Sequence, residues 1–375
     1  MYCELMNAIP TRAATTSPSI SLNAGGLRSL FAFFREHRGS GSPLVLATVI
    51  ATTGTTYRKR GAQMLIRNDH QWHGLLSGGC LEGDLAAHAN EVFDGGQARI
   101  VDYALSAMTD AVWGFGLGCD GSVRILLQRL DAANAWEPYA SLVKAVEQGE
   151  SGRLVLVCGS TDPKAAVGIW SLESDGTSMT GPLAALSLPL PEGLAAQSAE
   201  QATITHHGYS HECVGLPLPH LPRLMILGGG PDAVPLTQFA AQLGWHVVVA
   251  DHRPAYADPE RFPCADRVVL APNQTLPAAI DLSSADAIVI MSHNLAADER
   301  YVAAAAHSRA RYIGLLGPAA RKSKLLSTLP AHFMTDARFR GPVGLDLGGE
   351  GPESIALSIV AEIQAMLHGR LPLAR

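Results

Sequence analysis

One segment of the sequence restricts the possible fold more than any other. Residues 224–253 read LMILGGGPDAVPLTQFAAQLGWHVVVADHR: an apolar run, a glycine-rich turn, an amphipathic stretch and a second apolar run. The second run ends at Asp251, about 20 residues past the glycines, which is the layout of a dinucleotide-binding βαβ unit. A Rossmann-like parallel sheet is therefore predicted for the C-terminal part of the chain.

The glycine turn also has a chemical interpretation. Gly228 permits a tight turn, and Gly230, which follows Gly229, lets the backbone approach a pyrophosphate closely. The amides that open the next helix would point at the anion, together with the positive end of the helix dipole. Asp251 would accept hydrogen bonds from a ribose. The alternative interpretation is a Rossmann-like βαβ unit that binds no nucleotide.

Composition narrows the class of protein. The chain has 375 residues, 47% hydrophobic and 17% charged, so it can bury a large core and form about two or three domains. A net charge of −6 without a long basic run argues against a nucleic-acid partner. No apolar stretch reaches about 18 residues, so no membrane span is expected. Six cysteines without a CxxC pair fit a reducing cytoplasm, where we expect the protein to be, better than a disulfide scaffold.

The sequence divides into a flexible N-terminal arm and two folded domains. We expect the arm over residues 1–22, a mixed α/β domain over 23–210, a proline-marked linker over 211–222, and a doubly wound Rossmann-like domain over 223–375. In the first domain, spacing and apolar runs predict helices over 24–38 and 81–93, and strands over 43–53, 62–67, 98–103, 122–130, 153–159, 166–170 and 201–205.

Two turns in the first domain carry a cysteine among glycines. In one, Gly78 and Gly79 lead into Cys80 at the start of a helix, where the helix dipole favours the thiolate that binds metals or attacks sulfur. In the other, WGFGLGCDG, Cys119 stands just before a strand, and the surrounding glycines suggest that backbone comes close to a ligand. A single cysteine is more often a small core residue, but two in matching settings favour a functional role.

A third feature is a basic turn between two strands, formed by Arg58, Lys59 and Arg60. The planar donor fork of arginine and the point charge of lysine could together clamp a phosphate. The alternative is a solvated turn. Spacing alone does not tell whether this turn lies near the two cysteine turns.

Together these segments resemble the XdhC/CoxI family, the accessory proteins that mature molybdenum cofactor for xanthine dehydrogenase and related molybdenum hydroxylases. The resemblance covers nearly the whole chain apart from the N-terminal arm, and its longest match is PVGLDLGGEGPESIALSIVAEI at residues 342–363. The other matching segments are RKRGAQML (58–65), SGGCLEGDL (77–85), GLGCDG (116–121), LGGGPDAVPL (227–236), DHRP (251–254), RFPCAD (261–266), SHN (292–294) and YIGLLG (312–317).

The resemblance implies a function and a set of partners. Such a protein binds molybdenum cofactor, as molybdopterin or its dinucleotide form, and helps a terminal oxo ligand become a sulfido ligand, with a cysteine desulfurase as the sulfur source. It then delivers the cofactor to an apo molybdenum hydroxylase, so it is a homodimeric maturation chaperone rather than a turnover enzyme. The implied site residues are Cys80 and Cys119 for molybdenum contact or sulfur handling, and Arg58, Arg60, Gly78, Gly79, Gly228, Gly229, Gly230, Asp251 and Arg253 for cofactor binding.

Two other functions stay open at this point. The Rossmann fingerprint alone would favour an NAD(P)-dependent oxidoreductase that acts on a small molecule, although no motif supplies a convincing proton donor. The chain could instead be an interaction protein that bridges a hydroxylase and a desulfurase without holding a ligand.

His293 follows a predicted strand and is expected to line the same crevice as Asp251 and Arg253.

Overall fold

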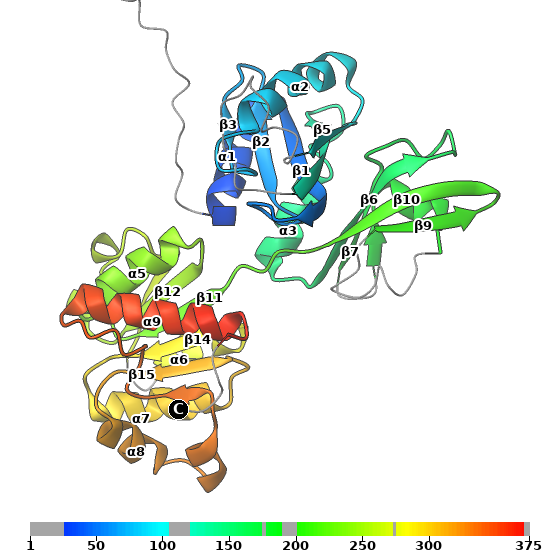
Figure 1. Ribbon diagram of the computed structural model, residues 1–375. Helices are drawn as coiled ribbons and strands as arrows, with labels where there is room; N and C mark the ends of the chain where they lie inside the picture. The colour runs from blue at the N-terminus through cyan, green and yellow to red at the C-terminus, as the bar shows by residue number, and fades with distance from the viewer. Residues whose placement is uncertain (1–25, 105–120, 175–177, 190–200, 273–274, 371–375) are drawn as a thin grey trace, which may run out of the picture.

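The computed structural model describes residues 26–104, 121–174, 178–189, 201–272 and 275–370 (Figure 1). The N-terminal domain begins with a five-stranded antiparallel sheet in the order β3-β2-β1-β5-β4. Its elements are α1 (Gly26–Ser40), β1 (Leu44–Gly54), β2 (Gln63–Arg67), β3 (Trp72–His73), α2 (Glu82–Gly95), β4 (Arg99–Ala104) and β5 (Gly121–Leu130).

The central strand β1 is covered on both faces, which explains its continuous apolar run. Val45, Ala47 and Val49 pack with the apolar face of α2, whereas Leu44 and Leu46 face α1. A strand buried on both sides cannot alternate polar and apolar residues. The sheet therefore lies between two hydrophobic layers.

A second antiparallel sheet follows in the same domain, in the order β8-β7-β6-β10-β9 (Figure 1). Its elements are α3 (Tyr139–Gln148), β6 (Gly152–Ser160), β7 (Trp170–Ser174), β8 (Ser178–Thr180), η2 (Pro182–Leu186), β9 (Gln201–His206) and β10 (Tyr209–Pro217). Apolar side chains of α1, α3 and both sheets form one shared core. The N-terminal domain is therefore one packed unit, and its mixed α/β class is confirmed.

Two boundaries differ from the sequence prediction. The linker expected over 211–222 is shorter, because residues up to Pro217 belong to β10 and only 218–222 connect the domains. The prolines of this stretch led to the linker prediction, but the residues before them form a strand in which His211 and Cys213 to Leu216 are buried. The strand expected over 166–170 begins only at Trp170, because the preceding residues form a turn around Gly168, at φ 85°.

The C-terminal domain is a six-stranded parallel sheet in the order β13-β12-β11-β14-β15-β16, with helices on both faces (Figure 1). Helices α5 and α9 pack on one face and α7 and α8 on the other, so the doubly wound prediction is confirmed. Its elements are β11 (Arg223–Leu227), α5 (Ala233–Gln242), β12 (His246–Asp251), η3 (Pro254–Tyr256), η4 (Pro259–Arg261), β13 (Arg267–Leu270), α6 (Leu276–Ala279), η5 (Leu282–Ser284), β14 (Ala287–Ile290), α7 (Leu295–Ala306), β15 (Tyr312–Leu315), α8 (Ala319–Leu326), η6 (Ala331–Thr335), β16 (Phe339–Arg340) and α9 (Pro352–Leu367).

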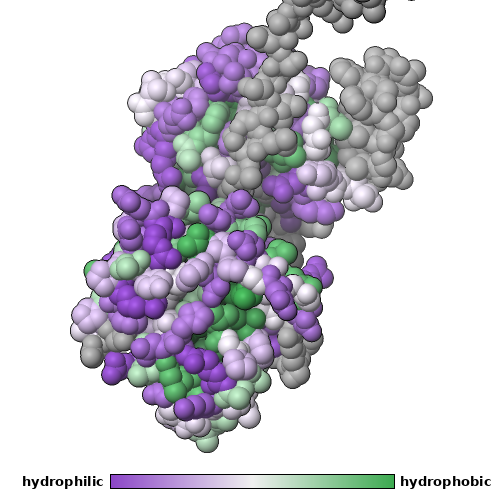
Figure 2. Space-filling model, turned by 90° about the vertical axis from the view of Figure 1, so that its left-hand side faces the viewer, coloured by the Kyte–Doolittle hydropathy of each residue, from purple (hydrophilic) through white to green (hydrophobic). Residues whose placement is uncertain are grey.

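The surface of the C-terminal domain is mixed. In Figure 2 the C-terminal domain is the lower body, and the face in view carries small hydrophobic patches separated by hydrophilic residues. Leu347 and Leu357 are about half exposed, at 54% and 52%. Isolated exposed hydrophobic side chains are normal for a folded domain. Within the described ranges, no helix is both long and apolar enough to cross a membrane.

Candidate functional site

The sheet of the C-terminal domain has its topological switch point between β11 and β14, where the chain order reverses. Ligands of open α/β sheets bind in the crevice outside the carboxyl ends of the strands at this point. Gly228 forms the wall on the β11 side at φ 122°, and a Cβ there would come within 2.5 Å of the Met291 carbonyl group. The turn thus needs glycine to pack against the end of β14.

The next two glycines serve different purposes. A Cβ on Gly229 would overlap the carbonyl oxygen of Tyr256, so this position is filled by the chain's own segment around η3. A Cβ on Gly230 would meet only the His293 ring, at 3.7 Å, which is ordinary contact. Of the three glycines, Gly230 is therefore the one whose Cβ position is not filled by the chain's own backbone.

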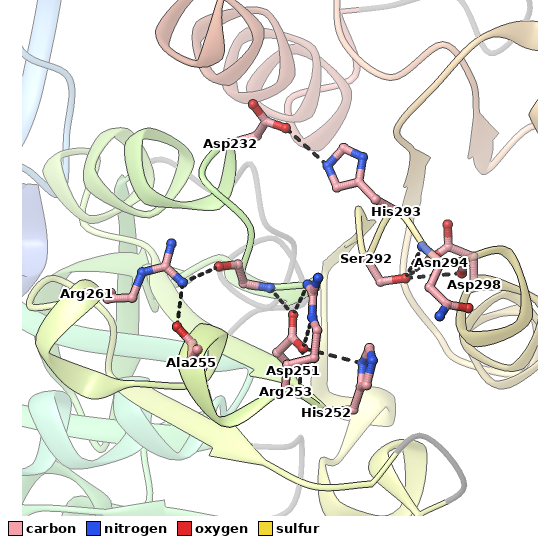
Figure 3. Close-up of polar contacts among 11 residues, drawn as sticks. Asp232, Asp251, His252, Arg253, Ala255, Arg261, Ser292, His293, Asn294 and Asp298 are labelled. Atoms are coloured by element: carbon pink, nitrogen blue, oxygen red, sulfur yellow. Dashed lines mark hydrogen bonds and ion pairs between the residues drawn. The ribbon is translucent and has the colours of Figure 1, made fainter.

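Asp251 anchors this turn from the end of β12 (Figure 3). Its side chain is fully buried and accepts hydrogen bonds from the Gly229 amide at 2.8 Å and from the amide of Arg253 at 2.8 Å. The Arg253 guanidinium donates to both carboxylate oxygens, from Nε at 3.0 Å and from Nη2 at 2.8 Å. Burial alone would raise the pKa of Asp251, but the hydrogen bonds from Arg253 and Gly229 outweigh it and hold the pKa below its ordinary value. The ribose contact expected of Asp251 stays a prediction.

Two arginines flank an aromatic ring beside the glycine turn. The Arg253 guanidinium lies 3.9 Å and that of Arg261 5.0 Å from the ring centroid of Tyr256, and both are cation–π contacts. Arg261 also donates to the carbonyl oxygens of Gly229 at 3.0 Å and Ala255 at 3.1 Å (Figure 3). Arg261 was not among the predicted site residues, although its place in the RFPCAD motif marked it.

The opposite wall of the crevice is the loop after β14. His293 Nε2 lies 3.3 Å from Asp232 Oδ2 and so bridges this loop to the glycine turn, as Figure 3 shows. The His293 backbone adopts the left-handed region at φ 59°, which is uncommon for a residue other than glycine. Ser292 contacts the buried Asp298, which accepts a hydrogen bond from Arg321 at 2.7 Å.

The first cysteine turn of the N-terminal domain is held by an acidic side chain that sequence reasoning missed. Glu82 is fully buried, and its carboxylate accepts hydrogen bonds from the amides of Leu76 at 2.8 Å, Ser77 at 2.8 Å and Gly79 at 3.1 Å. The Ser77 hydroxyl in turn accepts from the amides of Cys80 at 3.0 Å and the residue after it at 2.9 Å. Gly78 and Gly79 have φ 83° and 107°, so the turn needs both glycines.

The basic turn lies beside the first cysteine turn. This proximity could not be predicted from the spacing in the sequence. The ring of Tyr57 would be 3.5 Å from a Cβ on Gly78. Arg58 is exposed and Arg60 partly exposed in the same turn. Gly121, which follows the second cysteine turn, packs so closely on Thr53 that a Cβ there would overlap the Thr53 carbonyl oxygen. Cys119 itself lies outside the described residues.

The described cysteines fall into two groups. Cys158 and Cys213 are buried in the second sheet, where burial raises the pKa of their thiols to about 12 and about 11, so these thiols are inert at neutral pH. Cys80 is half-buried in its glycine turn and Cys264 is exposed. Among the described residues no group of three histidine, cysteine or acidic side chains could hold a metal ion. Of the described cysteines, Cys80 is therefore the one whose thiol is both partly accessible to solvent and held in a turn that hydrogen bonds fix.

The structure thus brings the predicted residues together in two places. Gly228, Gly229, Gly230, Asp251 and Arg253 meet at the switch point of the C-terminal domain. The basic turn and the Ser77–Cys80 turn meet at the edge of the first sheet of the N-terminal domain.

These features define a two-domain protein whose C-terminal part is a Rossmann domain with a glycine turn and two neighbouring arginines at its topological switch point. Two family models match the sequence: one described as the XdhC Rossmann domain over residues 224–363, and one described as the XdhC and CoxI family over residues 37–104. The chain belongs to the XdhC and CoxI family.

Two curated relatives match over most of their length. A Bacillus subtilis protein described as a probable xanthine dehydrogenase subunit is 32% identical over 85% of this chain and 92% of its own. The Escherichia coli molybdenum cofactor insertion chaperone PaoD is 25% identical over 91% of this chain and 89% of its own. The crystal structure of a xanthine dehydrogenase from Bacillus halodurans superposes with a TM-score of 0.73 and 29% identity, covering 92% of this chain and 97% of that one. The family resemblance of the sequence is thereby confirmed.

Proposed function

We propose that this protein is an accessory chaperone that binds molybdenum cofactor and supplies it to an apo molybdenum hydroxylase of the xanthine dehydrogenase type. The descriptions of the two relatives, one a cofactor insertion chaperone and the other a probable xanthine dehydrogenase subunit, support this role. The single observation that carries the proposal is the Cys80 turn. Its half-buried thiol lies in a turn of two glycines, and the Glu82 carboxylate fixes this turn by accepting a hydrogen bond from the Gly79 amide.

The Cys80 turn has the properties that a molybdenum contact requires. Soft thiolate ligands suit a thiophilic metal centre, and a half-buried thiol can reach a ligand without being lost in the core. Arg58 and Arg60 follow Tyr57, whose ring lies against this turn, and would supply positive charge for an anionic cofactor. By family resemblance, Cys119 is assigned to the same role.

The crevice of the C-terminal domain is the second contact region. Gly230 leaves room for a ligand, and the guanidinium groups of Arg253 and Arg261 place positive charge beside the turn. This arrangement suits the phosphate of the pterin, or the pyrophosphate of a dinucleotide form. Because the two regions lie in different domains, each is tested by its own variants.

An anaerobic titration tests the proposal. Wild-type protein, Cys80→Ala and Cys119→Ala are titrated with molybdenum cofactor, and bound molybdenum is measured per chain after gel filtration. Wild type should bind stoichiometrically, and each variant should bind at least about tenfold more weakly. Cys264→Ala is the matched control, because Cys264 is exposed outside both turns. No molybdenum retained by wild type, or equal retention by all four proteins, would contradict the proposal.

Sulfuration and delivery need separate assays. The proposal includes sulfuration of the bound cofactor by a cysteine desulfurase and transfer to the hydroxylase by a homodimer in the cytoplasm. Mixing loaded protein with an apo-hydroxylase should restore hydroxylase turnover, and turnover should depend on prior incubation with the desulfurase and cysteine. Restored turnover without the desulfurase would remove the sulfuration step and leave the delivery step.

The second candidate function is an NAD(P)-dependent oxidoreductase. One observation favours it: a glycine turn at the switch point of a parallel sheet, followed by an acid at the end of the second strand. Tight binding of NADH or NADPH by wild type, with no affinity for molybdenum cofactor, would support this function instead.

A further inference from the structure

The carboxylate of Asp251 is already occupied by a pair of donors that resembles a ribose diol. In dinucleotide-binding folds, the acid at the end of the second strand accepts hydrogen bonds from the ribose hydroxyls. Here the Arg253 guanidinium donates from Nε to Oδ1 at 3.0 Å and from Nη2 to Oδ2 at 2.8 Å. A guanidinium is a planar fork of two parallel donors that fits a carboxylate in this way.

The guanidinium is fixed in this position from several sides. It stacks on the Tyr256 ring at 3.9 Å from the centroid, and the Arg253 amide donates to the same carboxylate. Asp251 is 0% exposed, so no second face of the carboxylate is open to a ligand. Because the carboxylate is buried, a ribose would have to displace the guanidinium and leave it without its charged partner, which is costly.

The segment around η3 closes the remaining space. The Tyr256 carbonyl oxygen lies where a Cβ on Gly229 would be, and the Gly229 amide donates to Asp251 at 2.8 Å instead of pointing at a ligand. Two polar groups of the fingerprint, the acid and one turn amide, are thus paired with each other. Gly230 remains the open position of the turn.

We propose that Arg253 occupies the ribose subsite of this Rossmann domain and makes the crevice selective against adenine dinucleotides such as NADH and NADPH. The crevice then accepts an anion at Gly230 and Arg261 that makes no ribose contact at Asp251, such as a phosphate monoester. The identity of that anion as the molybdopterin phosphate rests on the proposed function, whereas the exclusion of adenine dinucleotides does not.

The test is a gain of binding. Full-length wild type and Arg253→Ala are titrated with NADH and with NADPH, and binding is followed by nicotinamide fluorescence. Removing the guanidinium leaves Asp251 with only the backbone amides of Gly229 and residue 253 as donors and opens the carboxylate to a ribose diol, so Arg253→Ala should bind NADH at least about tenfold more tightly than wild type. Arg267→Ala is the matched control: it removes an exposed cation at the amino end of β13, whereas Asp251 lies at the carboxyl end of β12, and its NADH affinity should equal that of wild type.

Three results would overturn the proposal. One is tight NADPH binding by wild type that Arg253→Ala loses, which would make Arg253 a receptor for a 2′-phosphate. Another is a folded Arg253→Ala protein, judged by its thermal unfolding, with no gain in NADH affinity. The third result applies if Arg253→Ala does not fold. Arg253→Met then takes its place, because methionine keeps an unbranched side chain against Tyr256 and has no donor for Asp251, and no gain in NADH affinity by Arg253→Met would overturn the proposal. Molybdenum cofactor is absent from these assays, so their outcome is independent of the proposed function.

Discussion

Glu82 holds Ser77 through both its amide and its hydroxyl, and this pair determines the shape of the Cys80 turn. The Glu82 carboxylate accepts from the Ser77 amide at 2.8 Å and from the Ser77 hydroxyl at 2.5 Å. The same hydroxyl oxygen accepts from the amide of Cys80 at 3.0 Å. The thiol is thus positioned by a partly buried chain of hydrogen bonds, and its position depends on an acid two residues further along the sequence.

The first prediction concerns this chain of hydrogen bonds. Glu82→Ala leaves the amides of Leu76, Ser77 and Gly79 without their acceptor, and each buried unpaired amide costs about 1–3 kcal/mol. We expect the free energy of unfolding in urea to fall by at least about 3 kcal/mol. Glu91→Gln on the same helix is the control, because Glu91 is exposed and its change should stay within about 0.5 kcal/mol. Equal losses for the two variants would refute the structural role of Glu82.

The second prediction concerns acid stability. The pKa of Asp251 is lower in the folded protein than its ordinary value. Its contribution to stability is therefore fully present above an unfolded pKa of about 4 and is lost as pH falls through the folded value. In Asp251→Asn, the fall in unfolding free energy below about pH 4 should be shallower than in wild type. It should not vanish, because burial is likewise outweighed by hydrogen bonds at Asp286 and Asp336, whose pKa values are also lowered. Unfolding curves at several pH values measure the slope, and an unchanged slope would contradict the prediction.

The Rossmann domain could be predicted from sequence because its signal is local. The glycine turn of residues 228–230, the apolar runs around it and the acid at Asp251 all lie within one short segment. The partner of Asp251 could not be predicted. The fingerprint indicates a ribose acceptor, and only the fold shows that Arg253 turns back onto the carboxylate and stacks on Tyr256.

The Cys80 turn shows the same limit. The glycines and the cysteine were visible as a motif, but Glu82 looks like an ordinary acid in the first turn of a helix. Its burial follows from the loop before the helix, which wraps around the carboxylate. The contact between this turn and Tyr57 also depends on the fold. Tyr57 follows β1 and the turn follows β3, and the order β3-β2-β1 of the sheet brings the two segments together.

The third prediction concerns the approach to the C-terminal helix. Tyr312 donates to Glu362 at 2.6 Å, and the same carboxylate oxygen accepts from the Gly344 amide at 2.8 Å, all in the core. Tyr312→Phe removes one donor from a buried carboxylate, so the unfolding free energy should fall by about 2 kcal/mol. Tyr209→Phe is the control, because Tyr209 is 41% exposed and should change stability little. Equally small losses of unfolding free energy in Tyr312→Phe and Tyr209→Phe would contradict a stabilising role of this hydrogen-bond network.

The fourth prediction concerns the contact between the domains. Arg28 on α1 donates to the Trp245 carbonyl oxygen at 2.9 Å and forms an ion pair with Asp266 of the C-terminal domain. Arg28→Ala should loosen this contact and speed proteolytic cleavage of the connection at 218–222. Arg35→Ala, whose partner Glu147 lies in the same domain, should leave cleavage unchanged. High salt should reproduce part of the effect in wild type, because Arg28 is partly exposed and its ion pair is screened. An Arg28 variant with wild-type cleavage would show that other contacts fix the domains.

The last prediction separates stability from binding at His293. Asparagine tolerates the left-handed backbone conformation, so His293→Asn should keep the unfolding free energy within about 0.5 kcal/mol of wild type. The variant loses the imidazole that pairs with Asp232 across the mouth of the crevice next to Gly230. If the crevice holds the phosphate end of the cofactor, affinity for molybdenum cofactor should therefore fall severalfold. His207→Asn is the matched control, because His207 has the same backbone conformation, at φ 47°, on the β9–β10 hairpin of the other domain. It should match His293→Asn in stability and wild type in affinity. Binding that is equal in all three proteins would remove His293 from the contact region, whereas a loss in both variants would point to the backbone conformation and not to the crevice.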